Sequence, residues 1–166
     1  MKYIDAILIP SGPSDKIDIQ RAEGAIKEFW YGRNYVILGA GPDIYKAIEH
    51  QNKKEEIPKE LDHHLALYNF LASKIPQENL ELITKSTTAV QNFFEFFKDN
   101  MKGNFIICSD YWQLMKYMHI YNVLKKKGKI SEDVNIGYHV VETEKYYNWM
   151  KRQLSKLKTE FRLFRI

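Results

Sequence analysis

The sequence predicts one α/β domain, residues 1–166, with a Rossmann-like, doubly wound fold: a mostly parallel sheet of about five strands with helices on both faces. Short apolar runs alternate with amphipathic segments through the whole chain, which is typical of this fold class. The apolar runs are continuous, as expected of strands buried on both faces. With 166 residues, 45% of them hydrophobic, the chain can bury one substantial core.

The first half of the chain supplies three of the strands. They are the apolar runs 3–9, 35–38 and 80–83. Apolar residues at helical spacing predict helices between them. One stripe is Ala22, Ala25, Ile26, Phe29 and Trp30, and a later one is Leu61, Leu65, Tyr68, Ala72 and Ile75. Arg21 falls outside the first stripe. Pro42 suits the first turn of a short helix toward His50, and the charged segment 51–58 predicts a surface loop.

The second half continues the alternation. Two further strands are predicted at 105–108 and 134–141. The buried faces of the predicted helices are Val90, Phe93, Phe94 and Phe97; Leu114, Tyr117, Met118 and Tyr121; and Tyr146, Trp149, Met150, Leu154 and Leu157. The tail, 159–166, is expected to add a short edge strand.

Small, hydroxylic or glycine residues follow the first four predicted strands. They are Ser11 and Gly12; Gly39, Ala40 and Gly41; Ser86, Thr87 and Thr88; and Ser109, Asp110 and Tyr111. In an open α/β sheet, ligands bind beyond the carboxyl ends of the strands, where the strand order reverses. Helices that begin behind these turns would direct backbone N–H groups toward a phosphate or carboxylate. We therefore predict one site for a polar or anionic ligand where the turns converge.

Helix capping is the competing explanation for two of these turns. One hydroxyl among Ser86, Thr87 and Thr88 is enough to cap the next helix, and Gln91 would complete a capping box from Thr88. Asp110 would cap its own helix in the same way. Capping needs one hydroxyl where the third turn offers three, so the sequence leaves both roles open.

Other kinds of site have little support. Gly39-Ala40-Gly41 is not the full dinucleotide fingerprint, and no P-loop motif occurs. Asp62, His63 and His64 resemble a metal-binding motif, but adjacent helical residues diverge by about 100° and no Asp-x-Asp partner exists. We predict no metal site. Cys108 ends an apolar run and is expected to be a buried thiol, not a nucleophile.

The net charge of +4 is concentrated near the end of the chain, in a predicted basic helix and tail at about 142–166. Such a helix is either a solvated surface or a site for nucleic acid or anionic lipid. No apolar run is long enough to cross a bilayer, and we find neither a secretion signal nor a pair of cysteines. We expect a cytoplasmic protein.

The order of these segments resembles the YdcF/SanA/ElyC-like domain family. The resemblance covers 5–121 and rests on segments 5–12, 36–41, 86–92 and 107–111, with Arg21 in the first helix. It implies a Rossmann-like fold and a pocket for a nucleotide-like or anionic ligand at the strand ends.

Four positions depart from the family pattern. Ala89 and Gln91 replace a Thr and a Glu in the motif Ser-x-x-Thr-x-Glu-Asn, whose Ser86 and Asn92 are kept. Gln113 and Lys116 stand where the family has His and Arg. Glutamine does not exchange protons at neutral pH, and lysine lacks the bidentate fork of arginine. The departures predict a pocket but argue against the family's acid–base chemistry.

Taken together, the residues and the resemblance predict binding of a small polar or anionic ligand, nucleotide- or phosphate-like. The expected ligand-binding residues are Ser11, Gly12, Arg21, Gly39, Gly41, Ser86, Thr87, Thr88, Gln91, Asn92, Ser109, Asp110, Gln113 and Lys116. In an enzyme, a hydrolase or transferase, Asp110 would be the candidate base. The alternative is a non-enzymatic adaptor that binds nucleic acid or anionic membrane through the basic helix. A scaffold or dimer subunit, with Trp149 and Met150 exposed, is the third hypothesis.

Overall fold

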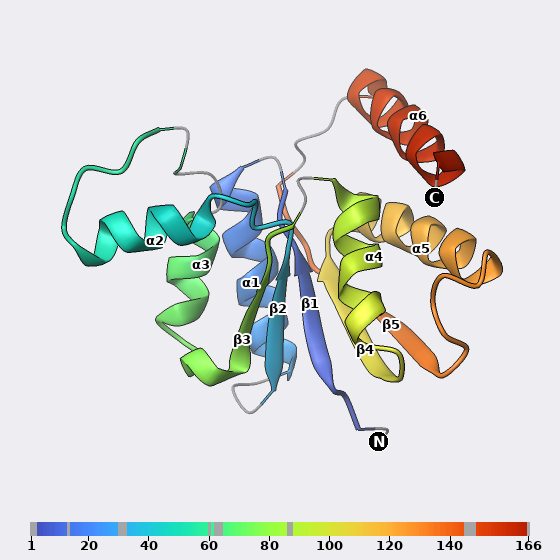
Figure 1. Cartoon of the computed structure of the whole chain (residues 1–166), viewed down its shortest axis with the longest axis horizontal. Helices are drawn as coiled ribbons and strands as arrows, with labels where there is room; N and C mark the ends of the chain where they lie inside the picture. Colours follow the sequence, from blue (N-terminus) through green and yellow to red (C-terminus); the bar gives the residue numbers. More distant parts are fainter. Residues whose placement is uncertain are drawn as a thin grey trace.

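A single parallel sheet organises the chain, with its strands in the order β3-β2-β1-β4-β5 (Figure 1). The computed structural model describes residues 3–12, 14–29, 33–59, 61, 65–85, 88–144 and 149–165, without the side chains of 149–154 and 165. The strands are β1 (Ala6–Pro10), β2 (Asn34–Leu38), β3 (Leu80–Ile83), β4 (Gly103–Ser109) and β5 (Val134–Val140). The order reverses between β1 and β4, so the predicted doubly wound α/β fold is confirmed.

Helices cover both faces of this sheet (Figure 1). They are α1 (Asp15–Phe29), α2 (Ile44–Asn52), α3 (Leu65–Ala72), α4 (Ala89–Asp99), α5 (Tyr111–Lys126) and α6 (Trp149–Arg165), with a 3₁₀ turn, η1 (Gln77–Asn79), before β3. Residues of α1, α2 and α3 share one buried cluster, and those of α4, α5 and α6 share the other. Among the residues described, none of the helices has both the length and the apolar character needed to cross a membrane.

Alternation along the central strands divides the core into these two clusters. Ile7 and Ile9 face α1, whose Ala22 and Ala25 are small enough to let the helix lie close to the sheet. Leu8 faces the opposite side, toward α4. Because they are buried on both faces, β1 is apolar throughout and β2 is apolar from Tyr35 to Leu38.

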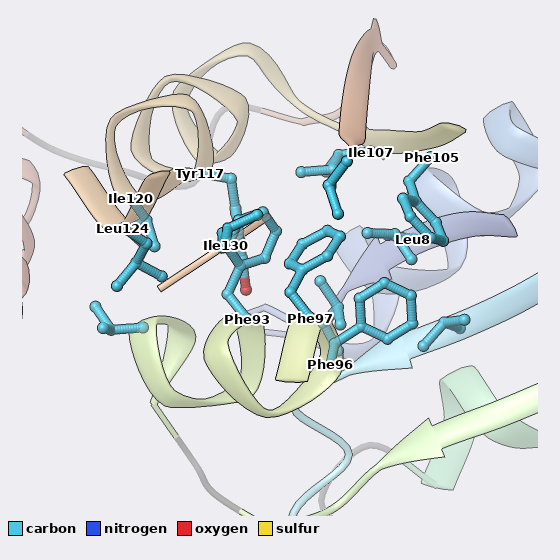
Figure 2. Packing of buried hydrophobic residues seen from close by; sticks show 14 of the residues in the cluster. Leu8, Phe93, Phe96, Phe97, Phe105, Ile107, Tyr117, Ile120, Leu124 and Ile130 are labelled. Atoms are coloured by element: carbon cyan, nitrogen blue, oxygen red, sulfur yellow. The ribbon is translucent and has the colours of Figure 1, made fainter. Parts of the chain in front are cut away.

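Phenylalanines dominate the cluster between the sheet, α4 and α5 (Figure 2). Phe97 lies 4.8 Å from Phe96 and 5.4 Å from Phe105, ring centre to ring centre, and both pairs meet edge to face. Phe93 packs on Tyr117 of α5 at 5.2 Å. The run of phenylalanines after the third turn therefore fixes α4, and with it the turn that precedes α4, against the sheet.

Parallel pairing brings all the carboxyl ends of the strands to one edge. Pro10 at the end of β1 is paired with Leu38 at the end of β2, and Leu38 with Ile83 at the end of β3. On the other side of β1, Leu8 is paired with Ile107 of β4. The turns predicted to bind a ligand thus begin at one edge of the sheet.

Four predictions for individual segments or residues are wrong. The tail is not an edge strand, because α6 continues to Arg165 and buries Leu163, which is 2% exposed. Leu157 is 66% exposed and points away from the core, since Thr159 and Leu163 occupy the inward side of α6. The first strand begins at Ala6, not at residue 3. Leu82 and Ile83 of β3 are only half-buried, because β3 is an edge strand.

Candidate ligand-binding site

The turns after β1, β2 and β3 are tied together at the carboxyl edge of the sheet. The backbone N–H of Ser11 donates to the carbonyl oxygen of Leu38 at 2.9 Å. Its hydroxyl donates to the carbonyl of Gly39 at 2.8 Å and lies 3.0 Å from that of Leu38. The N–H of Ala40 donates to the carbonyl of Ile83 at 3.2 Å. The predicted convergence holds for these turns, but the Ser11 hydroxyl is used inside the protein.

A buried ion network occupies the point where the strand order reverses. Arg21 is fully buried, and its Nη1 donates to Asp18 Oδ1 at 2.9 Å and to the Pro10 carbonyl at 3.1 Å. Its Nε and Nη2 donate to Asp110 Oδ2 at 3.1 and 2.5 Å. Arg21 was predicted to lie outside the buried stripe of its helix, and this prediction is wrong. Burial is possible because two carboxylates neutralise the charge of the guanidinium.

Backbone N–H groups stabilise the two carboxylates as well. Asp18 Oδ2 accepts a hydrogen bond from the N–H of Gly12 at 2.9 Å, and Asp18 lies in the first turn of α1. Asp110 Oδ1 accepts from the N–H of Gln113 at 3.2 Å, so Asp110 caps α5. Both carboxylates sit at helix N-termini, where the helix dipole favours negative charge. The capping role considered for Asp110 is confirmed.

Gly39 and Asn92 pack closely beside this network. Gly39 has φ of +89°, and a Cβ there would lie 2.8 Å from Asn92 Nδ2 and 2.9 Å from Ser11 Oγ. Only a glycine can therefore hold this turn without displacing a neighbour. The contact also places the Asn92 side chain, from α4, at the end of β2.

Two buried polar atoms at this edge have no hydrogen-bond partner among the described residues: Asn92 Oδ1 and Ser109 Oγ. Asn92 is 2% exposed and Ser109 is fully buried. A buried polar group without a partner costs about 1–3 kcal/mol, and native proteins contain few of them. Both atoms belong to residues predicted to bind the ligand.

Lys116 adds a cation to the same side of the sheet. It lies on α5, partly buried, and makes no hydrogen bond or ion pair with any described residue. Burial lowers its pKa from the ordinary value of 10.5, and the positive charges of Arg162 and Arg21 lower it further. Lys116 is thus a partly desolvated charge near two other cations, and an anion would stabilise it.

The remaining residues that the sequence analysis considered differ in their surroundings. Thr88 Oγ1 accepts a hydrogen bond from the N–H of Gln91 at 3.3 Å, which confirms its capping role. Gln91 is exposed, whereas Gln113 is buried. Gly41 has φ of +81° with no atom within 4 Å of an added Cβ. Ser86 and Thr87 lie outside the described residues, as do Asp62, His63 and His64.

Sequence reasoning missed two charged residues of the site, Asp18 and Arg162. Asp18 precedes Arg21 by three residues, a spacing that brings both side chains to one side of a helix and could have suggested the pair. Arg162 lies on α6, in a segment for which an edge strand was predicted.

Two other features of the molecule are not part of this group of polar residues. Cys108 is fully buried in β4, and burial, with the negative charge of Glu28, raises the pKa of its thiol, so the buried-thiol prediction is confirmed. A cavity of about 340 Å³ lies at the opposite, amino-terminal edge of the sheet, between Asp5, Asn34, Glu81, Asn100 and Lys102. Strand order favours the carboxyl edge for a ligand, and Asn92 Oδ1 and Ser109 Oγ, two buried polar atoms without partners among the described residues, lie there too.

Replacing Arg21 by Met should destabilise the domain by about 3–5 kcal/mol, because Asp18 and Asp110 would remain buried near each other without a cation. Urea unfolding followed by circular dichroism measures this loss. Lys27→Met is the matched control: Lys27 is exposed on the same helix, and its loss should change stability by no more than about 0.5 kcal/mol. Equal stability of the two variants would show that the network is not needed.

Gly39→Ala and Gly41→Ala separate backbone strain from crowding. Both positions have positive φ, so both variants should lose about 1 kcal/mol to strain. Gly39→Ala should lose a further 1–3 kcal/mol, roughly, because its methyl group displaces Asn92 and Ser11. Denaturant unfolding of both variants provides the measurement, and identical losses would contradict the close packing at Gly39.

Comparison of the chain with models of known protein families, with curated proteins and with solved structures found no match in any of the three. The resemblance to the YdcF-like family therefore stays a prediction, and the case for a site rests on its geometry.

Proposed function

We propose that the protein binds a small anionic ligand, phosphate- or nucleotide-like, at the carboxyl edge of the sheet. The site lies between β1 and β4, where the strand order reverses. The observation that carries the proposal is Lys116, a partly buried cation with no anionic partner among the described residues and a lowered pKa. An anion beside Lys116 would offset both the desolvation and the repulsion from Arg162 and Arg21.

The polar atoms nearby supply the means of orienting such a ligand. Ser109 Oγ can donate to an anionic oxygen, and Asn92 Oδ1 can accept from a hydroxyl or amino group of the same molecule. A ligand with an anionic group and a donor group, as in a nucleotide or a sugar phosphate, would satisfy both atoms. The resemblance to the YdcF-like family implies a pocket at the same place, the carboxyl ends of the strands. The proposal therefore includes membership of that family.

The proposal concerns binding and not catalysis. Asp110, the candidate base, already accepts hydrogen bonds on both carboxylate oxygens, from Arg21 and from the N–H of Gln113. Both oxygens are therefore held by partners inside the protein, and this arrangement supports a structural role for Asp110. Its position instead fixes the start of α5, and therefore the helix that carries Lys116.

Binding can be tested by calorimetry and thermal shift with inorganic phosphate, a sugar phosphate and nucleoside phosphates at two salt concentrations. Loss of a charged hydrogen bond costs about 1.5–3 kcal/mol, so Lys116→Met should weaken binding roughly tenfold to a hundredfold. Lys126→Met, on the exposed far end of the same helix, should bind as the wild type does. Failure of every anion to bind the wild type, or equal binding by both variants, would refute the proposal.

Without ligand, Lys116→Met should be more stable than the wild type at neutral pH. The pKa of Lys116 is lower in the folded state, so the folded protein binds fewer protons between that pKa and 10.5, and wild-type stability rises with pH there. Below this window the charge penalty is complete. The advantage of the variant should therefore fade as pH approaches 10.5, as urea unfolding across that range can show. A variant advantage that is constant with pH would contradict this origin.

A further inference from the structure

The outward side of α6 is apolar. Leu157, Phe161 and Phe164 are 66%, 58% and 85% exposed, whereas Thr159 and Leu163 are 4% and 2% exposed. Leu157 and Phe161 stand two residues before and after Thr159, and so lie about 160° around the helix from it. Phe164 falls on the same side. The three apolar side chains thus form a stripe that points directly away from the rest of the protein.

Basic residues flank this apolar stripe. Between Trp149 and Arg165 the sequence contains six basic residues and one acidic residue. Lys156 and Lys158 are exposed and project about 90–110° from the stripe, one on each side. The one acidic residue, Glu160, pairs with His119 of α5 at 2.8 Å. The exposed part of α6 therefore combines the apolar stripe with positive charge on both sides.

The body of the protein holds α6 in this orientation. Leu163 belongs to the buried cluster shared with α4 and α5, and its carbonyl oxygen accepts a hydrogen bond at 2.6 Å from Nζ of Lys127, the residue that follows α5. Figure 1 shows α6, in red, at the upper right of the molecule, above α4 and α5. The apolar stripe thus lies at the periphery of the molecule, where a flat surface can contact it.

We propose that this face of α6 binds the surface of an anionic lipid bilayer. Leucine and phenylalanine on one side, with lysines at the polar boundary, are the features of helices that lie in the interface between headgroups and acyl chains. The lysine stems would lie along the apolar layer while their ammonium groups reach the lipid phosphates. The helix would lie on the membrane and not span it.

Charge and area both favour a bilayer over other partners. Pairing with a second copy would bring two strongly basic helices together, and three apolar side chains fall well short of the roughly 1,200–2,000 Å² that stable interfaces bury. A nucleic acid would satisfy the basic residues but leave Leu157 and its neighbours facing a phosphate backbone. An anionic bilayer can pair with the lysines and also bury the apolar stripe.

Co-sedimentation of the full chain with vesicles tests this proposal. The wild type should bind equimolar phosphatidylglycerol and phosphatidylcholine more tightly than phosphatidylcholine alone, and less tightly at high salt. Leu157→Ser, Phe161→Ser and Phe164→Ser combined should weaken binding by about tenfold or more. Lys156→Glu with Lys158→Glu should weaken it by at least about fivefold per charge. Met101→Ser with Tyr45→Ser, which removes exposed apolar residues elsewhere, should change nothing.

Three results would overturn the proposal. The first is that the wild type does not bind the anionic vesicles. The second is that the triple serine variant binds them as tightly as the wild type does. The third is that the wild type is a dimer that does not bind vesicles, and that the triple serine variant is a monomer. Circular dichroism melting verifies that the variants are folded. If the triple variant does not fold, Phe164→Ser alone, at the most exposed position, tests the same stripe with a smaller change. The anion-induced thermal shift depends on Lys116, so the two proposals can fail independently.

Discussion

Burial of Arg21 requires the two helices and the two strands at the centre of the fold to be placed together. Its guanidinium joins Asp18 in α1, the end of β1 and Asp110 at the start of α5. A charge removed from water is tolerated only with complete pairing, so small displacements of any of these elements would be costly. The network therefore fixes the junction between β1 and β4, the place where open α/β sheets bind ligands.

The same junction combines satisfied and unsatisfied polar groups. The carboxylates around Arg21 accept hydrogen bonds from side chains and backbone, whereas Asn92 Oδ1 and Ser109 Oγ have no partner among the described residues. Lys116 adds a charge that burial disfavours. Binding sites commonly combine a rigid framework with polar groups that lack partners in the free protein. A ligand that supplies the missing hydrogen bonds or charge then gains binding free energy.

The sheet could be predicted from sequence because buried parallel strands are continuous apolar runs with glycine or hydroxyl residues after them. Arg21 could not, since its position depends on Asp110, which is 89 residues away in the chain. The end of α6 was missed because Phe161, Arg162 and Leu163 alternate between apolar and basic, a pattern that also suits an edge strand. Burial of Leu163 against α5 decides for the helix. Thr88 caps α4, so at least one of the three consecutive hydroxyls has a structural role.

Cys108 has a practical consequence for work on this protein. It is the single cysteine of the chain, it is fully buried in β4, and its thiolate form is disfavoured at neutral pH. Maleimide reagents should leave it untouched under native conditions. A fluorophore or spin label could therefore be attached to one engineered surface cysteine with the native thiol still in place, which would make distances and depth of immersion directly measurable.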